Sequence, residues 1–141
     1  MGIYLNPGNK GFWESIRSEI YVDKTNLISC TNNLLNTEDK FACVSRPRRF
    51  GKSMALKMLA AYYSRGCDSA DLFKGLKIEQ NDTFRTHLNK YNVILLNMQQ
   101  FLIEAGSGNL TEYLEQEVLG ELLEEYEDIL TGRDMGIAAA L

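Results

Sequence analysis

The hydrophobic positions of the chain form two short, uninterrupted runs and several stretches with the spacing of a helix. The runs cover residues 41–45 and 93–97. A short segment that is apolar at consecutive positions is typical of a strand buried on both faces of a parallel sheet. We therefore expect two parallel strands, joined by a right-handed crossover that contains a helix.

The clearest helical pattern lies between these runs, from residue 52 to about residue 64. Spacings of i, i+3, i+4 and i+7 place four apolar residues on one face: Ala55, Met58, Leu59 and Tyr62. Gly66 follows as a plausible C-terminal stop. This helix is the predicted crossover between the two strands.

Weaker patterns predict three further helices. The first is capped by Asp23 or Thr25 and carries Leu27, Ile28, Leu34 and Leu35. A short one is expected at 82–88, and an amphipathic helix at 110–130 has eight acidic residues and no basic one. Its apolar stripe either packs on the core of this chain or binds a partner.

A basic loop connects the first predicted strand to its helix. Its residues are Arg46, Pro47, Arg48, Arg49, Phe50, Gly51, Lys52, Ser53 and Met54. A strand, a tight loop and a Gly-Lys-Ser that opens a helix form the layout of a phosphate-binding loop. The Walker A pattern has glycine at both ends of its six-residue core, whereas this chain has Arg46 at the first end. A Gly-Lys-Ser that occurs by chance at a helix start is the alternative.

Each residue of Gly-Lys-Ser has a physical role in binding ATP or another nucleoside triphosphate. Gly51 leaves room for a phosphate against the backbone, and the N-terminus of the following helix attracts an anion. Lys52 is expected to reach the β- and γ-phosphate oxygens, and the Ser53 hydroxyl to bind Mg²⁺. The three arginines contact phosphate, contact nucleic acid, or form a solvated basic turn.

These elements predict an α/β fold, a P-loop NTPase-like parallel sheet flanked by helices, of which the chain contains only part. A lead-in segment at 1–40 precedes a partial nucleotide-binding domain at 41–141. Hydrolysis needs a carboxylate at the end of a second buried strand, but the run at 93–97 ends in the neutral amide Asn97. We therefore expect binding without hydrolysis by this chain alone. Residues 132–141 read as the start of another helix, so we expect an N-terminal fragment.

Composition fits one globular domain. The 141 residues are 45% hydrophobic and 24% charged. No apolar run approaches the roughly 20 residues that span a bilayer, and no signal peptide is evident, so we expect a cytoplasmic protein. The cysteines match neither a disulfide framework nor a zinc site, and Cys43 is expected to face the core.

The formal net charge of -4 conceals an asymmetry. Residues 1–90 carry 14 Lys and Arg against 9 Asp and Glu, whereas residues 91–141 carry 1 against 10. The two parts therefore have charges of about +5 and about −9. Either the charged surfaces fold back on each other, or the basic face meets phosphates.

Three segments together resemble the AAA-ATPase-like family of bacterial proteins. They are Tyr-Val-Asp-Lys-Thr at 21–25, Ser-Arg-Pro-Arg-Arg-Phe-Gly-Lys-Ser at 45–53 and Leu-Phe-Lys-Gly-Leu-Lys-Ile at 72–78. The resemblance covers about residues 3–130. It implies a P-loop ATPase module in which an arginine at position 46 is a family trait.

The resemblance also implies site residues and missing parts. It supports Gly51, Lys52 and Ser53 as nucleotide-phosphate and magnesium positions, and it gives no firm chemistry for Asp23 and Lys24. Such proteins have a Walker B strand after the acidic helix and a PD-(D/E)XK nuclease-like C-terminal domain, and this sequence contains neither.

Two functions of other classes remain open. One is a nucleic-acid-binding module that uses the basic loop, or a nucleic-acid partner bound by the missing C-terminal domain. The other is an inactive truncated remnant.

Overall fold

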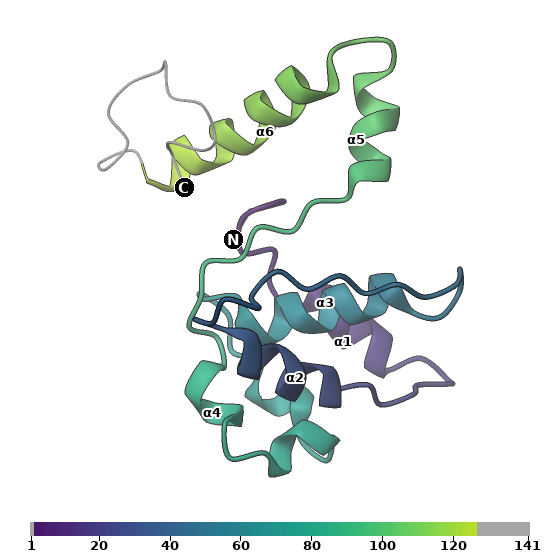
Figure 1. Cartoon of the computed structure of the whole chain (residues 1–141), viewed down its shortest axis with the longest axis vertical. Coiled ribbons are helices and arrows are strands. Elements are labelled where there is room, and N and C mark those ends of the chain that lie inside the picture. Colours follow the sequence, from purple (N-terminus) through teal and green to yellow (C-terminus); the bar gives the residue numbers. More distant parts are fainter. Residues whose placement is uncertain (1, 127–141) are drawn as a thin grey trace.

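The computed structural model describes residues 2–126, which form two groups of helices. α1 to α4 surround one aromatic core, and α5 and α6 form a second group joined to it by an extended linker (Figure 1). The helices are α1 (Lys10–Ile16), α2 (Asn26–Leu34), α3 (Lys52–Tyr63), α4 (Phe84–His87), α5 (Met98–Ala105) and α6 (Leu110–Glu125). Two short 3₁₀ helices, η1 (Ala70–Phe73) and η2 (Lys77–Gln80), lie between α3 and α4.

The first core is built around α3. Tyr62 is fully buried and its ring lies 5.7 Å from that of Phe73 and 5.9 Å from that of Phe84. Phe12 of α1 stacks on Phe73 with ring centroids 5.0 Å apart. The Tyr62 hydroxyl donates to the carbonyl of Phe84 at 2.7 Å, so the one polar atom of this ring is satisfied within the core.

The second core joins α5 and α6 to the N-terminal segment. Phe101 of α5 and Val118 and Leu122 of α6 are buried together with Leu5. The predicted apolar stripe of α6 therefore packs within the chain, at Val118 and Leu122. Two predictions lie outside the described residues: the end of this helix at 127–130 and the start of another helix at 132–141.

The predicted parallel sheet is wrong for the part of the chain that the structure describes. Within residues 2–126 there is no strand, and the β pairing consists of two isolated bridges, Leu5 with Ile94 and Ser64 with Tyr91. Residues 41–45 are extended and solvent-exposed, with Phe41 at 88% and Val44 at 56%. A strand needs a neighbour for its backbone N–H and C=O groups, and residues 41–45 have none here.

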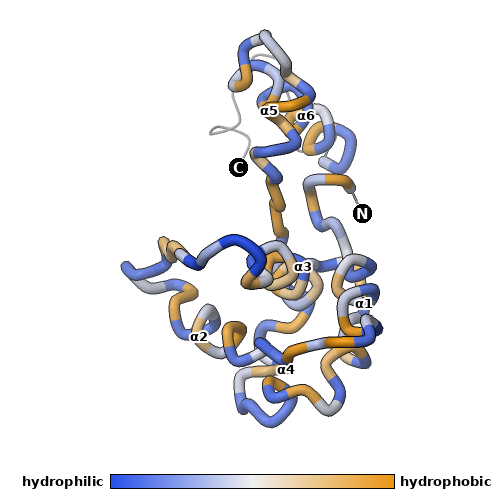
Figure 2. Tube along the Cα trace, turned by 90° about the vertical axis from the view of Figure 1, so that its right-hand side faces the viewer, coloured by the Kyte–Doolittle hydropathy of each residue, from blue (hydrophilic) through white to orange (hydrophobic). Residues whose placement is uncertain are grey.

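The second apolar run pairs with the N-terminal segment instead of with residues 41–45. Leu95 N–H donates to the Tyr4 carbonyl at 2.9 Å, and Asn6 N–H donates to the Val93 carbonyl at 2.7 Å. Ile94 and Leu96 pack against the second core. The run thus forms the apolar linker between the two helical groups that Figure 2 shows in orange.

Most of the predicted helices are present. α3 and α6 begin at the expected residues, α4 lies within 82–88, and α2 carries Ile28 into the core. α5 was not expected, because its residues follow directly on the apolar run. Cys43 is exposed and not in the core, since no sheet covers it. No helix among residues 2–126 combines the length and apolarity that crossing a membrane requires.

Candidate phosphate-binding loop

The backbone at Gly51 turns the basic loop into α3. Gly51 has φ 77° and ψ 28°, the left-handed region that glycine adopts without a steric penalty. Its carbonyl accepts the first helical hydrogen bond, from Ala55 N–H at 3.0 Å. No side chain caps the N-terminus of α3 in the described structure. The first-turn N–H groups of this helix therefore face a position where an anion would be favoured.

The Lys52 ammonium folds back over the beginning of the loop. Its Nζ donates to the carbonyl of Arg46 and, at 3.2 Å, to that of Pro47. Lys52 and Ser53 are both exposed, so a ligand can reach them from solvent. These contacts show that the Lys52 side chain is long enough to reach the first residues of the loop.

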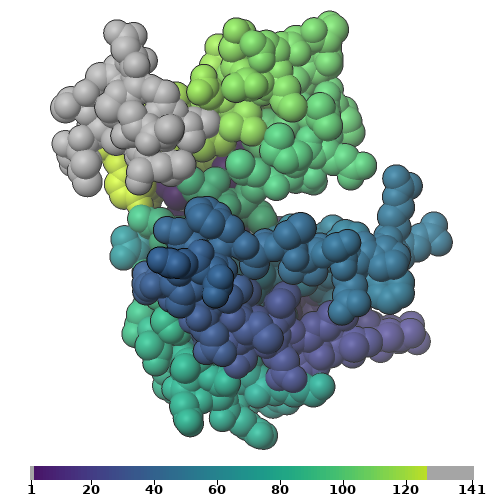
Figure 3. All heavy atoms as spheres, in the orientation of Figure 1, coloured from purple at the N-terminus to yellow at the C-terminus, as the bar shows by residue number. Residues whose placement is uncertain are grey.

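The three arginines lie on an open surface. Arg46, Arg48 and Arg49 are all exposed, and the loop holds no carboxylate, since no Asp or Glu occurs between residues 40 and 67. Figure 3 shows side chains from this blue part of the chain standing out from the body of the molecule, and Figure 2 shows a strongly hydrophilic stretch beside α3. Arg49 has φ 68°, a conformation that costs a non-glycine residue about 1–3 kcal/mol.

A lysine from a distant segment also reaches the loop. Lys24 Nζ donates to the Phe50 carbonyl at 2.5 Å, and it lies 2.8 Å from the position that a Cβ on Gly51 would occupy. The sequence pattern at residues 21–25 indicates a family segment but does not by itself assign a role to Lys24. The signal available in the sequence was a lysine within one of the three segments that carry the family resemblance, but its partner, 26 residues away, could not be identified from the pattern.

Hydrogen bonds fix the segment that carries this lysine. Asp23 Oδ1 accepts from the N–H of Thr25 at 2.8 Å and from its hydroxyl at 2.7 Å, and Asp23 Oδ2 accepts from Lys77 N–H at 2.8 Å. Thr25 is fully buried and accepts from Ile78 N–H at 3.1 Å. Burial alone would raise the pKa of Asp23, but the hydrogen bonds from Thr25 and Lys77 outweigh it and hold that pKa below its usual value.

All three segments of the resemblance therefore meet in space. Residues 21–25 contact the loop through Lys24 and η2 through Asp23 and Thr25. Thr25 occupies the N-cap position of α2 without capping it, because its hydroxyl oxygen accepts from Ile78 N–H while the hydroxyl proton is donated to Asp23.

A small apolar cavity lies beside the loop. It has a volume of about 280 Å³ and is bounded by α2, α3 and the extended residues 42–44, with the Lys52 stem in its wall. Its lining is mostly apolar, so the N-terminus of α3 is the more favourable place for a phosphate.

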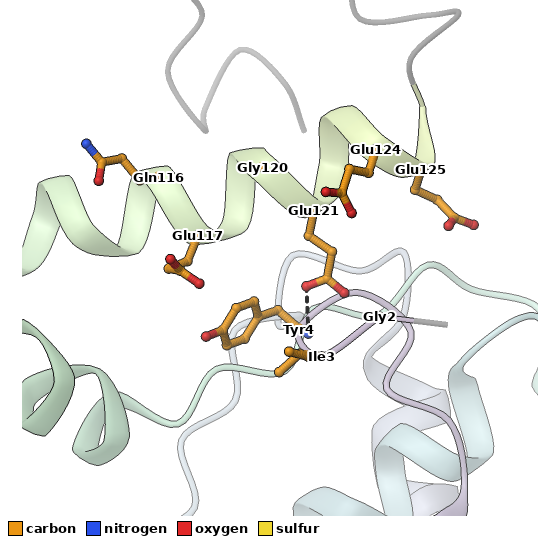
Figure 4. A pocket seen from close by; sticks show the side chains of 9 residues that line it. All are labelled: Gly2, Ile3, Tyr4, Gln116, Glu117, Gly120, Glu121, Glu124 and Glu125. Carbon is orange, nitrogen blue, oxygen red and sulfur yellow. Dashed lines mark hydrogen bonds between the residues drawn. The ribbon is translucent and has the colours of Figure 1, made fainter.

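A larger cavity of about 740 Å³ lies between the N-terminal segment and α6 (Figure 4). Glu117, Glu121, Glu124 and Glu125 line it, and Glu121 accepts a hydrogen bond from Tyr4 N–H at 2.8 Å. Burial, and then the negative charges of nearby glutamates, raise the pKa of the Tyr4 phenol. This negative lining repels a phosphate, which leaves the α3 N-terminus as the better anion site.

Metal-binding side chains are sparse. Between residues 2 and 126 no group of three or more His, Cys, Asp or Glu side chains could hold a metal ion. Asn97, at the end of the second apolar run, caps α5 by accepting from Gln99 N–H at 3.2 Å. A magnesium ion at the loop would therefore depend on Ser53, water and the phosphates of its nucleotide.

Comparison with known proteins places the chain in a family. The family described as "Predicted AAA-ATPase" (AAA-ATPase-like) matches residues 10–138. Neither a curated protein nor a solved structure matches the chain.

Proposed function

Since the chain belongs to the AAA-ATPase-like family, a membership that indicates a nucleotide-binding, ATPase-like role, we propose that residues 46–54 bind the phosphates of ATP together with Mg²⁺. The observation that carries this proposal is the left-handed Gly51 directly before the uncapped N-terminus of α3. It leaves backbone N–H groups free for an anion at the point where Lys52 is within reach.

The proposal gives each residue a role. The N–H groups of Lys52, Ser53 and Met54 bind a phosphate, and the Lys52 ammonium exchanges the Arg46 and Pro47 carbonyls for phosphate oxygens. The Ser53 hydroxyl is a magnesium ligand, in a coordination shell otherwise made of water and phosphate oxygens. Arg46, Arg48 and Arg49 add positive charge around the phosphates.

Binding, and not hydrolysis, is the activity proposed for residues 1–141. The amide of Asn97 cannot accept a proton from an attacking water at neutral pH, and its oxygen is engaged in capping α5. The carboxylate that would orient an attacking water has no counterpart in the loop, which contains no acidic residue.

Calorimetric titration of the protein with ATP and Mg²⁺ tests the proposal. We expect Lys52→Ala to weaken ATP binding by at least about tenfold, because it removes a charge-assisted hydrogen bond worth about 1.5–3 kcal/mol. Lys57→Ala is the matched control, since Lys57 is an exposed lysine of the same helix. Equal affinities in the wild type and Lys52→Ala would refute the proposal.

The exposed arginines support a second candidate, binding of nucleic acid through the same loop. It predicts DNA binding that weakens steeply with salt and persists in the presence of saturating ATP. Competition by ATP would instead assign the loop to the nucleotide. The acidic surface of α6 disfavours a broad nucleic-acid interface.

A further inference from the structure

Two lysines hold the two ends of the phosphate-binding loop. Lys52 contacts the carbonyls of Arg46 and Pro47 at its beginning, and Lys24 contacts the carbonyl of Phe50 at its end. The two ammonium groups come from different helical segments, one from the residue before the N-cap of α2 and one from the first turn of α3.

The position of Lys24 relative to Gly51 points to a ligand. A Cβ at Gly51 would lie 2.8 Å from Lys24 Nζ, so the ammonium covers the face of the backbone that the glycine leaves open. In a phosphate-binding loop, that open face is the approach of the phosphate. An ammonium already near this face needs only a side-chain rotation to reach a phosphate oxygen.

The backbone of Lys24 is held in place by its neighbours, and its ammonium is engaged by the Phe50 carbonyl and not by a carboxylate. Thr25 is fully buried, and its side chain joins Asp23 to η2. Lys24 itself is half-buried and makes no salt bridge in the described structure, where the single ion pair joins Asp71 and Lys74. Its positive charge is therefore uncompensated, next to a loop that carries four further positive charges at Arg46, Arg48, Arg49 and Lys52.

We propose that Lys24 is a second phosphate-binding lysine, which exchanges the Phe50 carbonyl for a phosphate oxygen when a nucleoside triphosphate binds. This inference rests on the proposed function of the loop. The Asp-Lys-Thr segment then has a divided role: Asp23 and Thr25 anchor it to η2, and Lys24 supplies the charge. The uncompensated charge of the loop favours a ligand with several negative charges, so the contribution of Lys24 is expected to grow from AMP to ATP.

Titration of Lys24→Gln with ATP and with AMP tests the inference. Glutamine removes the charge and keeps a polar side chain with N–H donors. We expect ATP binding to weaken by about ten- to a hundredfold, AMP binding to change by less than about threefold, and Lys24→Arg to retain most of the ATP affinity. Lys57→Gln controls for the general loss of a positive charge near α3.

Chemical labelling of the wild-type protein keeps the inference testable if Lys24→Gln does not fold. An amine-acetylating reagent modifies exposed lysines, and mass spectrometry measures the extent at each one. We expect ATP to protect Lys24 and Lys52 and to leave Lys57 unchanged, with weaker protection by AMP.

The outcomes separate the two proposals. Suppose that the wild type binds ATP and that Lys52→Ala abolishes this binding. If Lys24→Gln then binds ATP like the wild type, or loses affinity for ATP and AMP by the same factor, Lys24 is not a phosphate ligand. The proposed function of the loop would stand in that case. If ATP protects Lys52 but not Lys24 from acetylation, Lys24 is likewise not a phosphate ligand. If the wild type binds no ATP, the proposed function fails, and the inference on Lys24 fails with it.

Discussion

Asp23 accepts a hydrogen bond from the backbone N–H of Lys77 at 2.8 Å, across 54 residues of sequence. The same carboxylate accepts two hydrogen bonds from Thr25. Asp23 thereby joins the start of α2 to the start of η2, and it holds the neighbouring Lys24 against the loop. The geometry of the candidate site depends on this carboxylate, although the hydrogen bonds of Asp23 go to Thr25 and to η2 and not to the loop.

Replacement of Asp23 by Asn should destabilise the fold. An amide has one acceptor oxygen, so it cannot accept from Thr25 and Lys77 as the carboxylate does, and hydrogen bonds to a charged group contribute about 1.5–3 kcal/mol. We expect the free energy of unfolding in urea to fall by about 1–3 kcal/mol. Asp71→Asn is the control and should cost less stability, because Asp71 pairs with Lys74 on the exposed surface. A smaller loss for Asp23→Asn than for Asp71→Asn would contradict this role.

The depressed pKa of Asp23 makes part of the stability dependent on pH. A carboxylate whose pKa is lower in the folded state contributes stability above its unfolded pKa, near 3.8, and loses that contribution as the pH falls through the folded pKa. The difference in unfolding free energy between the wild type and Asp23→Asn should therefore be constant from pH 7 to about pH 5 and shrink below about pH 4. A difference that persists undiminished at the lowest pH at which both proteins fold would argue against it.

Gly51→Ala should damage both stability and nucleotide binding. Alanine at φ 77° costs about 1–2 kcal/mol, and its Cβ would displace the end of the Lys24 side chain. Gly66→Ala is a matched control, since Gly66 has φ 84° and no heavy atom within 4 Å of an added Cβ. We expect similar losses of thermal stability in both variants and a loss of ATP affinity only in Gly51→Ala. Equal ATP affinities in the two variants would show that the Gly51 backbone is not part of the site.

Ser53→Ala should separate magnesium binding from phosphate binding. The hydroxyl is the magnesium ligand under the proposed function, whereas the Ser53 N–H remains in the alanine variant. ATP affinity measured with Mg²⁺ should fall by about tenfold, and affinity measured in EDTA should be unchanged. Ser53→Thr keeps a hydroxyl and should behave like the wild type in both buffers. A loss of affinity in EDTA as large as that in Mg²⁺ would assign Ser53 another role.

Tyr62→Phe tests the polar contact inside the first core. The hydroxyl donates to the Phe84 carbonyl and accepts from the Asn32 amide, so its removal leaves two buried groups without this partner. We expect a loss of about 1–3 kcal/mol in the free energy of unfolding. Tyr91→Phe, at a less buried ring, should cost less. An unchanged free energy of unfolding in Tyr62→Phe would mean that water replaces the hydroxyl.

The helices were the predictable part of the fold. α3 follows from local information, because its apolar residues recur with the helical period and a glycine precedes its first turn. Gly51, Lys52 and Ser53 could be identified for the same reason. A phosphate-binding loop is a continuous segment, so its residue types and their spacing can be recognised in the sequence. The pairing of the extended segments was not predictable, because an apolar run carries no information about which segment it pairs with.

By itself the sequence determined most of the helical segments, the basic loop at 46–54 and the family, because each of these is read from short continuous segments of the chain. Only the tertiary structure decided that residues 93–95 pair with residues 4–6 and that residues 41–45 stay exposed. It also decided that Lys24 meets Phe50 and that Asp23 meets Lys77. The physical reason is that each of these contacts depends on the partner that packing brings within hydrogen-bond distance, and that partner lies 26 to about 90 residues away.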